Sequence, residues 1–373
     1  LDSQTKSLMQ ELLLNIWNKK KTTIFFVTHD IEEAIFLADR VFIMGARPGE
    51  IKEEIEVNFT RPRNAEIKLS KIFLDIKKRI HYIIRGESIK AAQFRFYNID
   101  RKAITIGLHT WAGITPFYHA VDEGSFINKK LNLELISLEK DEDRIKAFKN
   151  KEIDLLHLTV DSIHYLKDKQ NIDCDIAMLL DDSNGGDALV AKNSINSVKE
   201  LKGKRIGVEK GLFSHFFMIH ILNKNGLKTK DINMVFLKGS DIGNAFLKDK
   251  IDAAIMWEPW LSNILRITNT KILTSTAEET NKIISVLYAR KDFIKNKKKE
   301  LKTIQDVWDK TTAKIKKNIP KYTTIMSPYI GLSESDFELQ IKKLKFIDNS
   351  NRDLYSKIVK KLIRESKDVW NIN

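Results

Sequence analysis

The chain has 373 residues, of which 42% are hydrophobic and 31% charged, enough apolar material for the cores of two or three domains. The formal net charge of +14 comes mainly from scattered lysines without an aromatic-interleaved basic stripe, so we expect a solvated basic surface and no nucleic-acid partner; docking near anionic lipid is the alternative. The single cysteine, Cys174, excludes an internal disulfide and a cysteine metal cage, and no run approaches the roughly 20 apolar residues of a membrane span.

The first part of the chain has the pattern of an α/β fold. Thr22–Val27 is β-branched and aromatic, which predicts a buried parallel strand, and His29 follows at the strand end, where α/β folds place ligand chemistry. Asp30 is a predicted N-cap for a helix over Ile31–Ala38. Later elements are predicted strands at Arg40–Met44 and Ile51–Val57 and an amphipathic helix at Ser70–Glu87.

Three segments of this part resemble the ATPases of ABC transporters, in the nitrate/sulfonate/taurine-import branch. Residues 27–34 read VTHDIEEA and are continued by LADR at 37–40, which resembles the switch-histidine segment. LDSQT at residues 1–5 resembles the D-loop, and RPR at 61–63 resembles the segment that precedes the last helix. The resemblance implies that His29 contacts the γ-phosphate and helps to hold the attacking water, and that Asp2 belongs to the D-loop.

The chain contains no GxxxxGK[ST] phosphate loop, no LSGGQ-like signature and no hydrophobic run ending in Asp-Glu. We therefore expect it to begin within a nucleotide-binding domain, with residues 1–87 as the truncated C-terminal part of that domain. The resemblance implies ATP and Mg²⁺ as cofactors of the full-length parent, and permease subunits and a second ATPase subunit as partners. For residues 1–373 alone we expect no cofactor and no ATP hydrolysis.

Residues 88–102 are polar and aperiodic, which predicts a linker, and after them strands alternate with helices, which predicts mostly parallel sheets. A helix is predicted to begin with Thr115 as N-cap and Pro116 at N1, another is predicted at Asp141–Lys149, and the last eighty residues read as helical. The predicted strands are Ile104–Leu108, Leu131–Leu138, Ile153–Leu158, Asp175–Leu180, Ala188–Ala191, Arg205–Glu209, Met234–Leu237, Ile251–Trp257, Lys271–Leu273 and Ile284–Ala289.

Segments spread over about residues 103–350 resemble, in order, the substrate-binding proteins of nitrate/sulfonate/taurine-type importers and, more distantly, the fungal thiamine-pyrimidine synthase. They are WAGITP at 111–116, LTVD at 158–161, DSNGGD at 182–187, VKELKGKRIGVE at 198–209, IDAA at 251–254 and WEPW at 257–260. The resemblance implies a two-lobed periplasmic-binding-protein-like (type II) domain over 103–373 that closes on a small molecule. Lobe 1 would comprise about 103–190 plus 285–373, and lobe 2 about 192–283.

Open α/β sheets bind ligands beyond the C-terminal ends of their strands, and this criterion selects the candidate ligand-binding residues. They are Trp111, Asp161, Asp182, Ser183, Gly185, Gly186, Asp187, Glu209, Ser214, Trp257 and Glu258. This set is rich in carboxylates and has only Lys210 as a nearby cation, which favours a small polar ligand with an amine, amidine or pyrimidine-like face over nitrate or sulfonate alone; a zwitterion such as an amino-sulfonate also fits. The structural alternatives are that Trp111 packs between lobes and that Asp161, Ser214 and the turn carboxylates only cap or brace the backbone.

Together these resemblances suggest an importer component in which an ATPase fragment is fused to a ligand-sensing, regulatory domain. ATPase domains lie in the cytosol and nothing between residues 60 and 103 could cross a membrane, so we expect a cytoplasmic protein, peripheral on the inner face of the cell membrane. One alternative is a stand-alone receptor that acts in trans. The other is a synthase-like enzyme, which would need a cysteine-rich motif that Cys174 alone cannot supply.

Overall fold

The computed structural model describes residues 3–45, 51–70, the positions 72–74, 76, 77, 79, 80, 83 and 84, and then 103–237, 239–267, 269–330 and 332–370. The chain forms two compact units, Leu1–Asp100 and Arg101–Asn373, and each is treated by itself. Asp2 and the predicted linker 88–102 lie outside the described residues.

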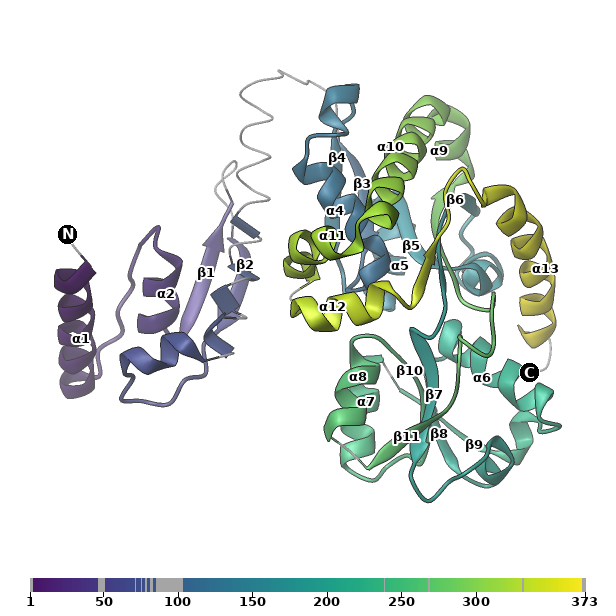
Figure 1. Ribbon diagram of the computed structural model, residues 1–373, viewed down its shortest axis with the longest axis horizontal. Coiled ribbons are helices and arrows are strands. Elements are labelled where there is room, and N and C mark those ends of the chain that lie inside the picture. The colour runs from purple at the N-terminus through teal and green to yellow at the C-terminus, as the bar shows by residue number, and fades with distance from the viewer. Residues whose placement is uncertain are drawn as a thin grey trace. The chain divides into compact units, whose positions relative to one another are not determined.

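The first unit packs helices against a two-stranded antiparallel sheet (Figure 1). Its elements are α1 Ser3–Lys20, α2 Ile31–Leu37, β1 Arg40–Met44, β2 Ile51–Glu56 and a 3-10 turn at Ala65–Leu69. The predicted N-cap of α2 is confirmed, because an Asp30 side-chain oxygen accepts a hydrogen bond from the Glu33 backbone N–H at 2.9 Å. The described positions between 72 and 84 are helical, as predicted, and Phe73 and Ile80 are buried in a core with Phe36 and Ile55.

The predicted strand Thr22–Val27 is wrong. Residues 21–28 have no regular secondary structure, and the side chains of Phe25 and Val27 are 85% and 82% exposed. A β-branched and aromatic run becomes a strand only where a neighbour supplies a hydrogen-bonding ladder, and none of the described residues pairs with this one. His29 therefore follows an exposed extended segment and is itself exposed.

The second unit contains two mixed sheets, one in each lobe (Figure 1). The six-stranded sheet of lobe 1 has the order β13-β6-β12-β5-β3-β4. Its strands are β3 Ile104–Leu108, β4 Leu133–Ser137, β5 Leu155–Thr159, β6 Cys174–Ser183, β12 Ile284–Arg290 and β13 Leu344–Phe346. The five-stranded sheet of lobe 2 has the order β11-β7-β10-β8-β9. Its strands are β7 Asp187–Lys192, β8 Arg205–Val208, β9 Asn233–Phe236, β10 Ala253–Trp257 and β11 Thr270–Ser275.

The prediction of mostly parallel sheets holds only in part, because each sheet contains reversed strands that make antiparallel pairs. In lobe 1, β12 runs antiparallel to both β5 and β6, and in lobe 2, β7 runs antiparallel to both β10 and β11. Parallel neighbours need a long crossover connection, usually a helix. The chain instead passes between the lobes through two helix-free segments, 184–186 and 276–283, so that β7 and β12 enter their sheets in the opposite direction.

The first crossing lies at 184–186, which places β7 in lobe 2 and moves the lobe boundary ahead of the predicted residue 190. Asp182 and Ser183 are the last two residues of strand β6, whereas the sequence suggested a loop there. The three-residue strand β13 interrupts the C-terminal region that was predicted to be all helical. Thr115 is the first residue of its helix, and its hydroxyl donates to the Ala112 carbonyl at 2.7 Å where an N-cap was predicted.

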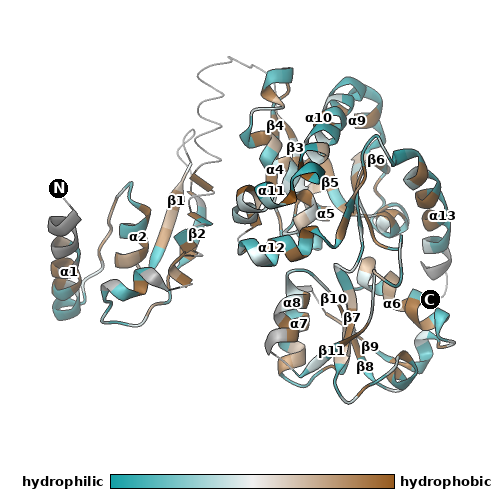
Figure 2. Cartoon of the chain, viewed as in Figure 1, coloured by the Kyte–Doolittle hydropathy of each residue, from teal (hydrophilic) through white to brown (hydrophobic). Residues whose placement is uncertain are grey.

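Helices cover the sheets of both lobes, and hydrophobic residues gather on the strands beneath them (Figure 2). Lobe 1 carries α4 Thr115–Asp122, α5 Asp141–Lys149, α9 Lys291–Asn296, α10 Lys298–Lys317, α11 Ile319–Met326, α12 Glu334–Ile341 and α13 Arg352–Trp370. Lobe 2 carries α6 Phe213–Lys224, α7 Gly239–Leu247 and α8 Trp260–Ile267. One hydrophobic cluster spans both lobes, because Leu156 and Val286 of lobe 1 and Phe216 and Leu222 of lobe 2 belong to it.

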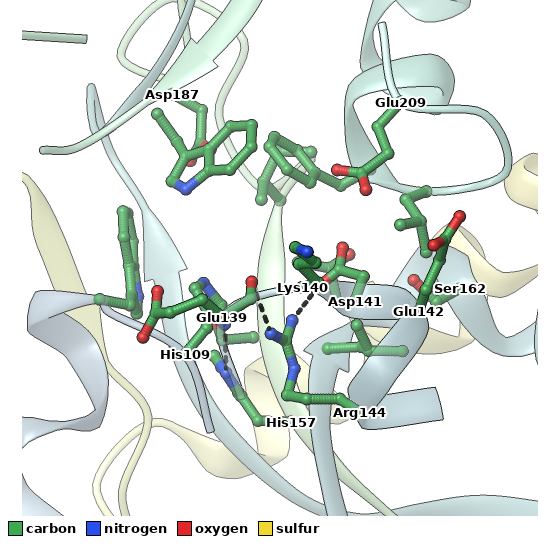
Figure 3. A pocket seen from close by; sticks show the side chains of 18 of the residues that line it. His109, Glu139, Lys140, Asp141, Glu142, Arg144, His157, Ser162, Asp187 and Glu209 are labelled. Atoms are coloured by element: carbon green, nitrogen blue, oxygen red, sulfur yellow. Dashed lines mark hydrogen bonds and ion pairs between the residues drawn. The ribbon is translucent and has the colours of Figure 1, made fainter. Parts of the chain in front are cut away.

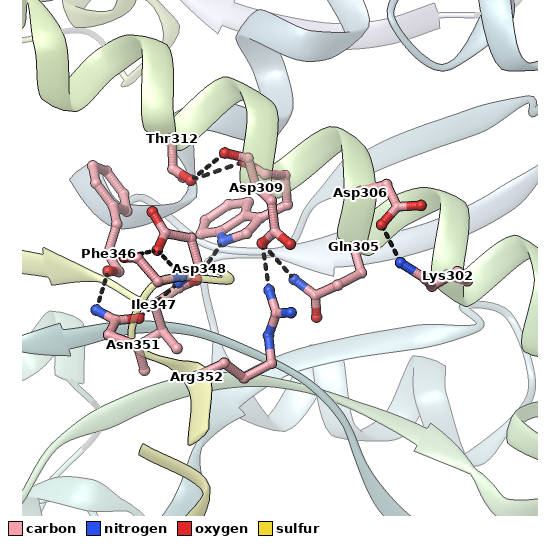
Figure 4. A network of polar contacts seen from close by, with 12 residues as sticks. Lys302, Gln305, Asp306, Asp309, Thr312, Phe346, Ile347, Asp348, Asn351 and Arg352 are labelled. Carbon is pink, nitrogen blue, oxygen red and sulfur yellow. Dashed lines mark hydrogen bonds and ion pairs between the residues drawn. The ribbon is translucent and has the colours of Figure 1, made fainter. Parts of the chain in front are cut away.

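A polar network joins α10 to the segment that leads into α13 (Figure 4). The Trp308 indole N–H donates to the Ile347 carbonyl at 2.9 Å, and Arg352 at the start of α13 forms an ion pair with Asp309. Trp308 is among the largest fully buried side chains, so this network is anchored in the core. It holds the C-terminal helix on lobe 1, beside the strand β6 that leads to the first crossing.

Candidate ligand-binding cleft

A cavity of about 150 Å³ lies between the two lobes of the second unit (Figure 3). Residues of both lobes line it. Lobe 1 and the second crossing contribute His109, Trp111, Glu139, Lys140, Asp141, Glu142, Arg144, His157, Leu158, Thr159, Ser162, Ile283 and Ser285. Lobe 2 contributes Asp187, Glu209, Leu212, Phe213, Trp257 and Trp260. The four aromatic residues Trp111, Phe213, Trp257 and Trp260 form most of its apolar wall, and carboxylates supply most of its charge.

Four of the predicted ligand-binding residues line this cleft. Trp111 follows β3, Glu209 follows β8 and Trp257 ends β10, all at the carboxyl ends of strands as the criterion requires. Asp187 begins β7, but β7 is antiparallel to β10 and pairs Asp187 with Trp257, so it reaches the same edge of the sheet. The antiparallel direction of β7, which the sequence pattern did not predict, is what brings these two residues together.

Trp111 is held from beneath by two of its neighbours. Its indole N–H donates to the Asp181 carboxylate at 3.0 Å, and its side chain is almost fully buried. Its ring lies on Gly186, where a Cβ atom would come within 2.7 Å of the ring. Gly186 is therefore needed for close approach to the ring, and it does not itself line the cleft.

The other predicted residues lie outside the lining and support it. The Ser214 hydroxyl accepts from the Glu209 backbone N–H at 2.9 Å, which fixes the strand end that carries Glu209. Glu258 is fully buried and accepts from Lys343 at 2.8 Å and from the Ser262 hydroxyl at 2.9 Å. This ion pair joins lobe 2 to lobe 1.

Three further predicted residues brace the first crossing. Asp182 points away from the cleft lining and accepts from the Tyr355 hydroxyl at 2.9 Å. The Ser183 hydroxyl is 2.8 Å from the Thr276 hydroxyl, which also accepts from the Gly185 backbone N–H at 2.8 Å. These contacts tie the two crossing segments to each other, as the sequence-based alternative of turn-bracing residues suggested.

Asp161 is also absent from the cleft lining, although its neighbours Thr159 and Ser162 are part of it. It lies within a 3-10 turn, Val160–Ser162, whose N-cap residue is Thr159. The predicted capping role is therefore not observed. Both of its carboxylate oxygens are buried without a hydrogen-bond partner in the described part of the chain.

Several lining residues were missed by the sequence reasoning. His109 comes directly after β3, so the strand-end criterion itself could have selected it. Asp141 and Arg144 lie on α5 and His157 lies within β5, and none of these positions carries a strand-end signal. They join the cleft because β5 and β3 are neighbours in the sheet and α5 packs against both.

Three buried basic groups of the cleft, His109, His157 and Arg144, are neutral or paired, whereas the lining residue Lys140 is exposed. The Nδ1 atoms of His109 and His157 are 3.2 Å apart and their rings stack, so one ring donates and the other accepts. Burial, followed by the Arg144 charge, lowers the pKa of His157 to about 3, and the same two causes with His157 hold the pKa of His109 well below its usual value. Arg144 donates to the Leu138 carbonyl at 2.5 Å and pairs with Asp141.

Three aspartates at or near the cleft, Asp161, Asp181 and Asp187, are buried. Burial is the main cause that raises the pKa of Asp187 and of Asp181 to about 7 and that of Asp161 to about 6. Hydrogen bonds from Ser183 to Asp187 and from Trp111 to Asp181 oppose the rise without cancelling it. Within the described residues, no lysine or arginine forms an ion pair with any of these three aspartates.

Residues 111–319 match the family model described as NMT1/THI5 like. The chain belongs to the NMT1/THI5-like family. The matched range begins at the cleft residue Trp111 and includes both crossings, both faces of the cleft and the whole of lobe 2.

Solved structures share the fold of the NMT1/THI5-like domain at low identity. The periplasmic aliphatic sulphonate binding protein SsuA from Escherichia coli is 16% identical with a TM-score of 0.58, covering 72% of this chain and 94% of its own. The alkanesulfonate-binding protein SsuA from Xanthomonas axonopodis pv. citri, bound to MOPS, is 14% identical with a TM-score of 0.58, covering 70% and 94%. These neighbours confirm the predicted two-lobed periplasmic-binding-protein fold.

The first part of the chain has curated relatives among ABC transporter ATP-binding proteins. An uncharacterized ABC transporter ATP-binding protein of Methanocaldococcus jannaschii is 45% identical over 91 residues, which are 24% of this chain and 33% of that protein. The aliphatic sulfonates import ATP-binding protein SsuB of Bacillus thuringiensis is 52% identical over 80 residues, 21% of this chain and 31% of that protein. The chain thus spans about a third of the length of these relatives. No described helix is both long and apolar enough to cross a bilayer.

Proposed function

We infer that the NMT1/THI5-like domain binds a small polar ligand in the cleft between its lobes and acts as the ligand-sensing, regulatory part of an ABC importer component. The observation that carries this proposal is the cleft itself. Aromatic residues and buried polar side chains from both lobes face one small cavity, an arrangement typical of binding sites for small molecules.

The first unit supports the connection with an importer. Its relatives are named as ATP-binding proteins, one of them for aliphatic sulfonate import, and the fold neighbours are named as sulfonate-binding proteins. We propose that in the full-length ATPase ATP and Mg²⁺ bind as in these relatives, with His29 at the γ-phosphate and Asp2 in the D-loop. Permease subunits and a second ATPase subunit are the proposed partners.

A regulatory role follows from the two parts lying in one chain. ATP-binding subunits work on the cytoplasmic side, so we propose that this domain is also cytoplasmic, peripheral on the inner face of the cell membrane. A receptor there would meet internal ligand. Ligand that closes the lobes would then bias the attached ATPase through its preference for one of two states.

Binding is tested by thermal unfolding of the whole chain with nitrate, sulfonates, amino-sulfonates and pyrimidines. At a hundredfold excess over Kd, a true ligand should stabilise the domain by about 2.7 kcal/mol. Trp257→Leu and Glu209→Gln should each reduce the shift, because both side chains line the cleft, while Asp175→Asn, at a half-buried aspartate outside the lining, should keep it. A panel that shifts no unfolding transition contradicts the binding function.

Regulation is tested in vesicles that contain the full-length ATPase and its permease. The ligand found above should change the transport rate in the intact protein and have no effect after deletion of residues 103–373 or in the Glu209→Gln variant. If transport responds to ligand equally after the deletion, the sensing role is refuted. Restoration of transport by the separate domain added from outside would instead favour a receptor that acts in trans.

A further inference from the structure

Two buried aspartates at the cleft, Asp187 and Asp181, form no ion pair with a lysine or arginine in the described part of the chain. Asp187 lines the cavity, is 3% exposed, and has one carboxylate oxygen without a hydrogen-bond partner. Asp181, directly beneath Trp111, is fully buried and also has one oxygen without a partner. Desolvated carboxylates without partners are costly, so the site favours an occupant that supplies positive charge or protons.

A second set of groups indicates a ligand at the same place. The Ser162 hydroxyl and the Nε2 atom of His157 are each about 1% exposed, line the cavity and have no hydrogen-bond partner. Figure 3 shows Asp187 on the opposite side of the cavity from His157 and Ser162, and Trp111, Phe213, Trp257 and Trp260 also line it. A ligand that fills the space would reach polar groups at both ends and aromatic surface along its length.

We propose that the ligand carries a protonated nitrogen, a primary ammonium or an amidinium, and that this group binds the Asp187 carboxylate, with the aromatic wall covering the remainder of the ligand. This inference rests on the proposed function and names the chemical class of its ligand. Asp181 acts as a positioning residue, because its contact is with the Trp111 indole N–H.

Other kinds of occupant fit the geometry less well. An anion would meet Asp187, Glu209 and Glu139, while the buried histidines are neutral, Arg144 is already paired and the remaining lining cation, Lys140, is an exposed side chain. A metal ion needs several ligands at one point, and the described residues contain no group of three or more His, Cys, Asp or Glu side chains placed to hold one. An organic cation needs only one carboxylate and an aromatic face.

Binding should release protons. Burial raises the pKa of Asp187 to about 7, and the charges of Asp181, Glu258 and Asp161 raise it further, so these negative groups face it from β6, from the end of β10 and from the 3-10 turn. A bound cation favours the ionised carboxylate, and the displaced proton goes to solvent. Near pH 7 about half the molecules carry this proton, so about half a proton per ligand should be released.

The test is isothermal titration calorimetry of the whole chain, near pH 7 and near pH 9, in phosphate and in Tris buffer. The probes are nitrate, cytosine and three matched pairs that differ in the charged nitrogen: benzylamine and benzyl alcohol, acetamidine and acetamide, taurine and isethionate. The charged member of at least one pair should bind at least about tenfold more tightly than its neutral or hydroxyl counterpart. The buffer dependence of its heat should give about half a proton released near pH 7. Near pH 9, acetamidine, which stays protonated, should release almost none, whereas the two amines, which are partly deprotonated in solution there, should take up protons on binding.

Asp187→Asn should weaken binding of that probe roughly tenfold to a hundredfold and remove the proton release, while the control Asp175→Asn, at an aspartate outside the cleft lining, should change neither. Equal binding of the two members of every pair, or binding without proton release in the wild type, would overturn the inference whatever the variant does. Binding of nitrate or isethionate alone would overturn the charged-nitrogen proposal and leave the binding function standing. No binding of any probe, including nitrate and cytosine, would contradict both.

Discussion

The sharpest prediction is that Asp187→Asn stabilises the unliganded NMT1/THI5-like domain at alkaline pH. Asp187 is 3% exposed and has no cationic partner among the described residues, so its ionisation in the folded state is costly. Asparagine has nearly the same shape and does not ionise. The substitution should therefore remove a destabilising charge while it removes a ligand contact.

The magnitude follows from the pKa. The pKa of Asp187 rises from the ordinary 3.8 to about 7. At 1.36 kcal/mol per pKa unit, its ionisation costs the folded state at most about 4 kcal/mol. Asp187→Asn removes the repulsion from Asp181 and Glu258 together with the burial of the charge, but the buried amide keeps part of the polar cost, so we expect about 2–4 kcal/mol. The folded state holds the proton between pH 4 and 7 while the unfolded state does not, so wild-type stability should fall as pH rises through that window.

The assay is urea unfolding of both proteins near pH 5 and near pH 8, followed by circular dichroism. The free-energy advantage of Asp187→Asn should be small at the lower pH and largest at the higher one, with an unchanged denaturant slope. Asp175→Asn should show no such pH-dependent gain, because the Asp175 carboxylate forms an ion pair with Lys167. A variant that is less stable than wild type near pH 8, or whose advantage is the same at both pH values, would refute the argument that Asp187 is buried without compensation.

Three other outcomes are expected. Lys343→Met should destabilise the domain by about 3 kcal/mol in thermal unfolding, because it leaves the buried Glu258 charge unpaired. Adding Glu258→Gln should restore most of that stability, and a double variant without this rescue would show that the loss of the ion pair is not the cause. Gly186→Ala should displace the Trp111 ring, since the new Cβ would lie 2.7 Å from it, and an unchanged tryptophan emission and ligand affinity would contradict this close contact. In phosphate-release assays, residues 1–373 should show no ATPase activity, and turnover by them would contradict this expectation. The proposed full-length ATPase should be active and His29→Ala should abolish its activity; turnover by that variant would exclude the role proposed for His29.

Sequence reasoning predicted the elements of the second unit well where the pattern is local. The helix Asp141–Lys149 matches α5 at both ends, and ten of the predicted strands overlap observed ones. A run of apolar residues bounded by turn residues is enough to predict a strand, because burial of side chains and local turn chemistry act over a few residues. The two predictions that failed concern the direction of some strands and the strand at Thr22–Val27. Both depend on which distant parts of the chain supply a neighbouring strand.

The candidate site shows the same division. The strand-end rule found Trp111, Glu209 and Trp257, and it also proposed Asp182, Ser183 and Glu258, which the fold uses to join its crossings and lobes. Both groups lie at or next to strand ends and both contain a carboxylate, so the sequence does not distinguish them. Only the side-chain direction and the partner across the sheet separate a lining residue from a supporting one.

The sequence by itself determined the α/β class, the family resemblance and an acidic, aromatic character for the binding region, since these depend on residue types and short motifs. The tertiary structure alone decided that Asp187 meets Trp257 across an antiparallel pair, that His109 and His157 share a neutral contact, and that Arg144 is already paired. The physical reason is that the charge of a site depends on burial and on which groups approach it. Those approaches join residues far apart in the chain, such as Trp111 and Asp181, and come into being only when the strands assemble into their sheet.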